Sequence, residues 1–196
     1  MATTRSYHHG NLRAALLESA ERTLAQRGVS ELSLRELARE VGVSHAAPRR
    51  HFADKRALLD ALAMDGFERL GRELDAAMAG AGDSLRDQLG AFGLAYVRFA
   101  TEHAALLELM FAGKHRDDSL QEASNRAFEG ALTLFARAQA SGHVVAGDPE
   151  RVGLVALATL HGLASLANNG MLEEGELDAA VGEAVDGIVL GLAPRP

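Results

Sequence analysis

Basic side chains gather in one short stretch of the sequence, VSHAAPRRHF at residues 43–52. This stretch contains His45, Arg49, Arg50 and His51. The guanidinium group of arginine can donate two parallel hydrogen bonds, either to phosphate oxygens or to the acceptor edge of guanine. These residues therefore predict a surface that binds a polyanion, and double-stranded DNA is the first candidate.

Small and hydroxyl-bearing residues around this stretch fit the same chemistry. Ala46 is small enough to let a backbone approach a base pair and to contact the methyl group of thymine. Ser33, Ser44 and Lys55 lie at or beside expected helix starts, where backbone amides and a cation can meet phosphates. The predicted DNA-contacting residues are Ser33, Ser44, His45, Ala46, Arg49, Arg50, His51 and Lys55.

Catalytic and metal-binding patterns are weak. The chain has no glycine-rich phosphate loop, no His-Glu-x-x-His motif, no nucleophile elbow and no cysteine. Two loop clusters, His8 with His9 and His115 with Asp117 and Asp118, have little potential as metal ligands. We expect no catalytic residue, metal or cofactor. Two alternatives stay open: an enzyme with an unrecognised site, and a helical homodimeric interaction protein whose basic head binds a partner other than DNA.

Helices are the elements expected to position the basic residues. Apolar residues recur at helical spacing from Leu12 to Leu24, and Gly28 is a stop signal for this first helix. A second helix is expected over 34–41, ended by a turn at Gly42.

Serine residues mark the starts of the next two expected helices. Ser33 and Glu36 have the spacing of a capping box, in which two backbone amides are satisfied reciprocally. Ser44 is a good N-cap for a third short helix. Three such helices, the last two joined by a tight turn, form a helix-turn-helix arrangement.

Pro48 falls at the fourth residue of the predicted third helix. There it removes only one helical hydrogen bond, the one to Ser44, so it distorts the first turn without breaking a long helix. We expect its ring to face inward and to share a small core with Phe52. The outward face then consists of His45, Ala46, Arg49 and Arg50.

Charge and composition divide the chain. Residues 1–56 carry ten Arg or Lys against six Asp or Glu, a net charge of +4, whereas residues 57–196 carry ten against twenty-one, a net charge of −11. A basic head on an acidic body predicts that only the head meets a polyanion. The helix-forming composition predicts an all-α chain of about nine helices. We expect a helix-turn-helix DNA-binding domain at 1–56 and a helical regulatory and dimerisation domain at 57–196.

Export and membrane signals are weak as well. The start of the chain has no apolar signal region, which predicts a cytoplasmic protein associated with the nucleoid. Residues 152–172 have no charged side chain and are long enough to span a bilayer, but they contain His161, Asn168 and several glycines. We therefore expect a helix buried in protein, and no membrane.

The segment SLRELAREVGVSHAAPRRHFADKRALLDAL resembles the DNA-binding domain of the TetR/AcrR-type transcriptional regulators. The resemblance runs from about Asn11 to Leu62, and it includes the Leu-Ala-Val-Gly-Val-Ser register, the His51–Phe52 pair and Lys55 at the start of the fourth helix. It implies a one-component repressor that binds a palindromic operator as a homodimer. It also implies that a small effector, bound in the helical body, moves the two heads apart.

Two positions depart from this family's pattern. Relatives usually have a tyrosine that contacts phosphate where this chain has Arg49. Arg49 either keeps the phosphate role, with a stronger salt dependence, or contacts a base instead. The segment TLHGLASL, together with YHHGNLR at the start, resembles the Trp-His-Gly segment of one C-terminal subgroup, but Leu160 replaces the tryptophan.

Two helical segments near the C-terminus, 149–168 and 177–192, are apolar around most of their circumference. Such helices bury one face on their own core and another on a partner, and small residues permit their close approach. They predict a four-helix interface across a two-fold axis, with a plain monomer core as the alternative. The predicted interface residues are Val152, Val155, Thr159, Leu163, Leu166, Val181, Val185, Ile188 and Leu192.

Aromatic residues recur in the helices between these regions. Phe92, Tyr96 and Phe99 share one helix face, and a buried Tyr96 would need a polar partner. They indicate either plain core or an apolar effector pocket with few polar groups. His161 is either a hydrogen-bonded core histidine or the polar group of that pocket. The predicted effector-binding residues are Phe92, Tyr96, Phe99, Met110, Phe111, Phe128 and His161, and the effector is expected to be apolar.

Overall fold

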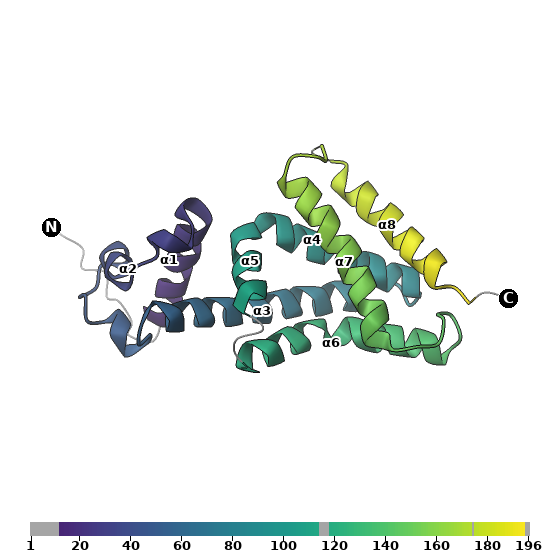
Figure 1. Ribbon diagram of the computed structural model, residues 1–196, viewed down its shortest axis with the longest axis horizontal. Coiled ribbons are helices and arrows are strands. Elements are labelled where there is room, and N and C mark those ends of the chain that lie inside the picture. The colour runs from purple at the N-terminus through teal and green to yellow at the C-terminus, as the bar shows by residue number, and fades with distance from the viewer. Residues whose placement is uncertain (1–11, 114–117, 174, 195–196) are drawn as a thin grey trace. The chain divides into compact units, whose positions relative to one another are not determined.

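The computed structural model describes residues 12–113, 118–173 and 175–194, and within these ranges the chain is helical, without strands (Figure 1). The all-α prediction is confirmed, with eight α-helices in the described ranges where about nine were expected for the chain. The α-helices are α1 (Leu12–Arg27), α2 (Leu34–Val41), α3 (Lys55–Ala79), α4 (Leu85–Glu102), α5 (Ala104–Gly113), α6 (Asp118–Ala140), α7 (Pro149–Asn168) and α8 (Leu177–Leu192). Two short 3₁₀ helices, η2 (Val29–Glu31) and η3 (Pro48–Arg50), precede and follow α2.

The chain forms two compact units. The first comprises Met1–Gly66 and Ala105–Leu120, and the second comprises Phe67–Ala104 and Gln121–Pro196. The long helix α3 contributes its first half to one unit and its second half to the other.

The first unit contains the expected helix-turn-helix. Gly28 ends α1 with a φ of 79° and donates its amide to the carbonyl of Leu24 at 3.0 Å. Gly42 ends α2 with a φ of 76°, a backbone conformation in which a residue with a side chain would be strained. The N–H of Val43 then donates to Ala38 O at 2.9 Å. This glycine-ended turn places the basic segment directly after α2, as the sequence predicted.

The capping box predicted at the start of α2 does not form. Ser33 occupies the N-cap position in an extended conformation, but its side chain accepts no hydrogen bond from the amides of the helix. The Glu36 carboxylate instead lies 3.5 Å from the guanidinium of Arg39, one turn further on. The prediction was wrong because sequence spacing does not determine which way an exposed Glu turns.

The predicted third helix is also different, because η3 and the turn before it replace an α-helix. Ala47 N–H donates to Ser44 O at 2.9 Å, and His51 N–H donates to Pro48 O at 3.0 Å. Pro48 has no N–H to offer Ser44, so the Ser44 carbonyl is satisfied by a tighter, three-residue turn. Pro48 therefore lies at the first position of η3 instead of the fourth position of an α-helix.

The burial pattern around Pro48 is the predicted one. Pro48 is buried, Phe52 is 2 % exposed, and both contribute to the core of this unit. The neighbouring side chains His45, Ala46, Arg49 and Arg50 are exposed.

Glu40 connects α1 to α2. Its carboxylate accepts a hydrogen bond from the buried Ser19 hydroxyl at 2.6 Å and another from Arg27 at 3.1 Å. The Ser19 hydrogen bond, with a smaller contribution from Arg27, holds the pKa of Glu40 below its ordinary value of 4.5. The ionised carboxylate therefore fixes the spacing of the two helices that support the basic segment.

We expect Glu40→Gln to lower the free energy of unfolding by about 1 kcal/mol or less at neutral pH, because the pair is partly exposed. Because the pKa of Glu40 is lower in the folded protein than its unfolded value of 4.5, the ionised carboxylate stabilises the fold above pH 4.5. This stabilisation is lost as the pH falls through the lower, folded-state pKa. Urea unfolding at several pH values would show the difference between wild type and variant shrinking with acid. Glu36→Gln, which lacks the Ser19 contact, is the control. A difference that stayed constant with pH would contradict this account.

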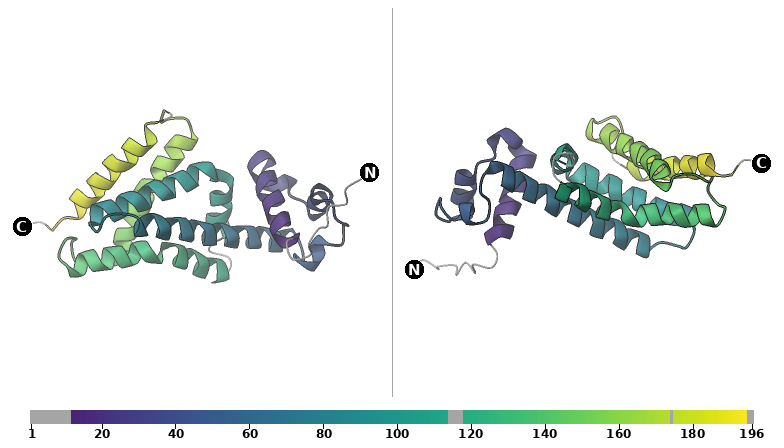
Figure 2. Two further views of the ribbon diagram at one scale, coloured as in Figure 1. Left: turned by 180° about the vertical axis from the view of Figure 1, so that it is seen from behind. Right: turned by 60° about the horizontal axis from the view of Figure 1, so that its bottom comes forward.

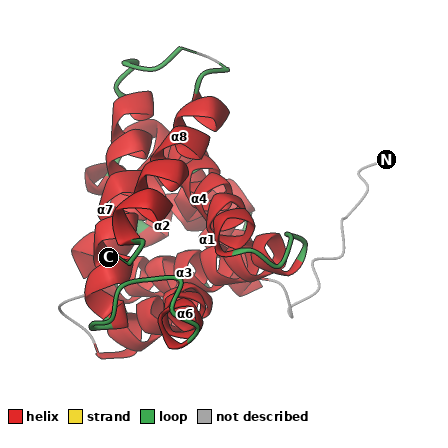
Figure 3. Cartoon of the chain, turned by 90° about the vertical axis from the view of Figure 1, so that its right-hand side faces the viewer, coloured by secondary structure: helices red, strands yellow, loops and turns green. Residues whose placement is uncertain are grey.

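In the second unit, α4 packs on α7 and α8, which also contact each other (Figures 2 and 3). Gly93 on α4 allows the close approach, since a Cβ there would lie 3.0 Å from Leu160 and 3.3 Å from Val181. Gly71 on α3 has the same effect against α6, because its Cβ would lie 3.1 Å from the Cα of Ala127. These contacts fix the packing of helices whose lengths and amphipathic patterns alone would allow several arrangements.

Two exposed ion pairs join α4 to α8. Arg86 donates two hydrogen bonds to Asp186, the shorter at 2.7 Å, and Arg98 donates to Asp178 at 2.7 Å. The Arg86 contact lowers the pKa of Asp186 below its ordinary value. Because these pairs are in water, they set the register of α8 on α4 more than they stabilise it.

Candidate functional site

The predicted DNA-contacting side chains lie on one region of the first unit. Ser44, His45, Ala46, Arg49, Arg50 and His51 are exposed, and Ser33 and Lys55 are half-buried. They come from three places in the fold: the N-cap of α2, the segment through η3, and the first residue of α3. Lys55 begins α3, as the sequence predicted for the fourth helix.

A hollow of about 620 Å³ lies between the starts of α2 and α3. Four predicted residues line it, namely Ser33, His45, Arg49 and Lys55. Arg35 also lines this hollow, and sequence reasoning missed it. The signal was available, because Arg35 is on the exposed side of the first turn of the amphipathic α2.

The charges around this hollow are mainly positive. Arg35 and Arg49 have no hydrogen bond or ion pair with any other described residue, so both guanidinium groups are free to bind. The Lys55 ammonium uses one of its three donors in a hydrogen bond to the Ser30 carbonyl at 3.0 Å. The one carboxylate, Asp54, caps α3 by accepting from Ala57 N–H at 2.8 Å. The geometry suits a phosphate group, with three cations and a helix start converging on one space.

Four of the predicted effector-binding residues form an aromatic cluster in the second unit. The rings of Phe92 and Tyr96 stack with centroids 6.4 Å apart, and the ring centroid of Phe128 lies 6.2 Å from that of Tyr96. Tyr96 is fully buried, and burial raises the pKa of its phenol above the ordinary range. Its hydroxyl lies 2.9 Å from Nδ1 of His161 on α7, which is the polar partner that the sequence required.

The other predicted effector residues lie elsewhere. Phe99 is 1 % exposed. The centroid of its ring lies 4.9 Å from the centroid of the His103 ring and 5.7 Å from Cζ of the Arg69 guanidinium. Met110 and Phe111 are on α5, in the first unit. The buried Met110 packs against Gly66, where an added Cβ would lie 2.6 Å from its sulfur.

The position of His161 does not fit the interpretation of this residue as a core histidine. It is exposed on α7, so it is not a core histidine, although it is hydrogen-bonded to a buried phenol. Helical periodicity could not show this, because α7 is apolar on both its inner and its outer side.

The predicted interface residues divide between two faces. Val181 and Val185 are 2 % and 0 % exposed and face the core of their own unit, so they are not available to a partner. Val155 is 61 % exposed, Leu166 is 39 % exposed, and Thr159 is exposed. Val152, Leu163, Ile188 and Leu192 are half-buried. Two residues not predicted, Leu154 on α7 and Leu190 on α8, are 65 % and 79 % exposed and extend the apolar surface.

No helix in the part of the chain that the structure describes is long and apolar enough to cross a membrane. The described ranges also contain no cluster of three metal-ligating side chains. The histidine pair His8 and His9, and the residues His115 and Asp117, lie outside the described residues.

Two family profiles match this chain. Residues 16–62 match the profile of the bacterial regulatory proteins of the TetR family, and residues 89–189 match the tetracyclin repressor-like C-terminal domain. Among curated proteins, no sequence matches the chain.

Solved structures agree with the profiles. A protein of unknown function from Rhodococcus sp. RHA1 is 46 % identical, with a TM-score of 0.89 over 97 % of this chain and 100 % of that one. A TetR family transcription regulator from Marinobacter aquaeolei VT8 is 20 % identical, with a TM-score of 0.79 over 95 % and 97 %. The regulator PfmR from Thermus thermophilus is also 20 % identical, with a TM-score of 0.70 over 91 % and 99 %.

The helix-turn-helix and the helical second unit define the class of DNA-binding transcription regulators. Within that class, the chain belongs to the TetR family. This is a family of bacterial regulatory proteins.

Proposed function

We propose that the protein is a repressor that binds a palindromic operator as a homodimer and releases it when a small apolar effector binds. The observation that carries this proposal is the cationic hollow at the starts of α2 and α3, next to the exposed basic segment 45–51. Residues 1–56 would form the operator-binding domain, and 57–196 the regulatory and dimerisation domain. The working location would be the cytoplasm, at the nucleoid.

The basic residues would have two roles. Arg49 lines the hollow with Arg35 and Lys55, so it would contact phosphate there. Arg50 does not line the hollow and has no partner among the described residues, so with Ala46 it would contact bases in the major groove. This assignment chooses the phosphate alternative for Arg49, in the place where relatives have tyrosine.

The dimer would form through the outer faces of α7 and α8. Leu154 and Val155 on α7 and Leu190 on α8 are large apolar side chains at 61 % exposure or more, and such exposed apolar surface marks interaction sites. Gly162 and Gly187 have nothing within 4 Å of where a Cβ would stand, so a partner helix could approach closely. Pairing α7 and α8 with their copies would make a four-helix interface.

The effector would act at the aromatic cluster of Phe92, Tyr96 and Phe128. Apolar rings adjoin a polar contact there, the one between Tyr96 and His161. An apolar molecule with one hydrogen-bonding group would displace this contact and shift α7 relative to α4. That shift would change the population of head spacings that fit the operator.

The test is a fluorescence anisotropy titration against DNA from upstream of the protein's own gene and its neighbours, at several salt concentrations. For the wild type, log affinity should fall by about 0.9 for each phosphate neutralised, per unit of log salt. Arg49→Ala should weaken binding to all sequences alike, by about tenfold or more, and should reduce the salt slope by about 1 per head.

Two variants are the controls for this titration. Arg50→Ala should change the preference for particular bases more than the salt slope. Arg151→Ala removes an exposed charge at the start of α7 and should leave binding unchanged. If Arg49→Ala altered the preference at one base and left the salt slope intact, the phosphate assignment would be wrong. Binding of the wild type that never exceeded binding to unrelated DNA would contradict the proposed function.

A further inference from the structure

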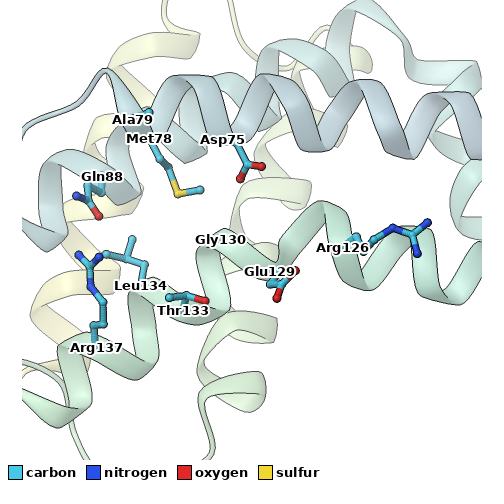
Figure 4. A pocket seen from close by; sticks show the side chains of 10 residues that line it. All are labelled: Asp75, Met78, Ala79, Gln88, Arg126, Glu129, Gly130, Thr133, Leu134 and Arg137. Carbon is cyan, nitrogen blue, oxygen red and sulfur yellow. The ribbon is translucent and has the colours of Figure 1, made fainter.

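Two adjoining hollows lie along α6 in the second unit. The first, of about 470 Å³, lies between α6, the last turns of α3 and the first turn of α4 (Figure 4). The second, of about 350 Å³, continues it toward the loop after α6. Leu134 and Arg137 line both hollows, so Arg137 stands where the two meet.

Gly130 lies at a close contact between α3 and α6, beside the first hollow. A Cβ at this position would lie 2.6 Å from the Met78 methyl group and 2.9 Å from an Asp75 carboxylate oxygen. The missing side chain lets α3 and α6 approach, and the side chains of Met78 and Leu134 line the space beyond this contact. The hollow therefore has an apolar part beside polar groups.

The polar groups near Arg137 lack partners in the described part of the chain. The side chains of Arg137, Gln88 and Thr133 make no hydrogen bond or ion pair with other described residues, and all three line the first hollow. Figure 4 shows the guanidinium of Arg137 directed toward Gln88, with Thr133 beside it. By contrast, Arg86, Arg98 and Arg126 of the same unit each lie within 4 Å of a carboxylate.

Acidic side chains also line the two hollows. Glu129 is eight residues before Arg137 on α6, which places it about 12 Å away along the helix axis. Asp75 is level with Gly130, near Glu129, and Asp83 lines the second hollow only. Over about 12 Å, water and salt screen the repulsion between Glu129 and an anion at Arg137, so the Arg137 end of the first hollow stays favourable for an anion.

We propose that this groove binds a small organic oxyanion, a carboxylate or a phosphate monoester, with its charge on Arg137, Gln88 and Thr133 and a short apolar tail against Met78 and Leu134. The guanidinium supplies paired donors that fit either oxyanion, and the amide and hydroxyl add one donor each. This site is separate from the effector site proposed above, and neither depends on the other.

The test uses the full chain and three probes: butyrate, butyl phosphate and the neutral butyramide. Amide chemical shifts are followed in ¹H–¹⁵N spectra during each titration. At least one anion should give saturable shifts at Gln88, Thr133 and Arg137, and butyramide should give none. A response to butyrate alone, or to butyl phosphate alone, would identify which oxyanion the groove takes.

Arg137→Gln should weaken binding of that anion by at least about tenfold, because a charge-assisted pair is lost. Arg126 lines the same hollow but pairs with Glu122 at 3.8 Å, so Arg126→Gln should change affinity less than about twofold. Both arginines are exposed, so the fold should survive, and Thr133→Val gives a second, smaller loss. Absence of saturable binding by either anion, equal binding of butyramide, or equal effects of the two arginine variants would overturn the proposal.

Discussion

Val155→Glu is expected to convert the protein to monomers and to abolish specific operator binding. Val155 is 61 % exposed in the single chain, so a glutamate there is solvated and folding should change by no more than about 0.5 kcal/mol. In the proposed dimer the same position is covered, and two carboxylates would be buried near the two-fold axis without partners. Each would cost about 3–5 kcal/mol, which raises the dimer dissociation constant by at least about a thousandfold.

Operator affinity should fall with the dimer, because one head reaches only one half-site. The expected loss is about a thousandfold or more, the usual margin between specific and non-specific binding. Analytical ultracentrifugation and the anisotropy titration measure the two effects on the same samples. Arg151→Glu, at the start of the same helix, is the matched control and should stay dimeric. A Val155→Glu protein that remained a dimer would show that the interface lies elsewhere.

Phe52→Ala is expected to unfold the operator-binding head. Phe52 is 2 % exposed, Arg13 lies over its ring at 5.8 Å, and the backbone amide of Phe52 donates to Pro48 at 2.9 Å. Removing the ring leaves a cavity in a small core and should cost about 3–5 kcal/mol, a large part of the stability of a small domain. Since η3 is held against α2 by this core, operator binding should be lost with it.

The loss of stability should appear in urea unfolding as a transition at lower urea concentration. The affinity for operator DNA, measured by fluorescence anisotropy, should be lower at every salt concentration. Val29→Ala is the control, because Val29 is 41 % exposed in the same unit and its truncation should cost less than about 0.5 kcal/mol. Full operator affinity in Phe52→Ala would mean that the basic segment does not depend on this core for its conformation.

The sequence was sufficient for the helix-turn-helix because its signals are local. Gly28 and Gly42 adopt positive φ where a side chain would be strained, and the spacing of Leu16, Ala20 and Leu24 gives one buried face. Local signals also predicted that Pro48 would be buried while its basic neighbours point outward.

The errors arose where local rules compete or where tertiary packing decides. Pro48 has no N–H to donate to the Ser44 carbonyl, which accepts from Ala47 instead, so a 3₁₀ helix formed where an α-helix was expected. In α8 the apolar stripe at Val181 and Val185 faces α4 and not a partner, because Gly93 brings the two helices together. Periodicity identifies an apolar face but does not say what covers it.

The effector and groove residues were the least accessible to sequence reasoning. Tyr96 and His161 are 65 positions apart, and their contact follows from how α7 packs on α4. The polar groups at Arg137 and Gln88 come from α6 and α4, 49 positions apart, and line one hollow only in the folded chain.

The most direct test of the proposed function is a selection of bound sequences from random double-stranded DNA, using the wild-type protein. We expect an inverted repeat with two equivalent half-sites, because two identical heads would be related by a two-fold axis. The bases nearest Arg50 and Ala46 should be the most restricted. An empty selection, or a bound motif without repeat symmetry, would contradict the proposal of a dimeric operator-binding repressor.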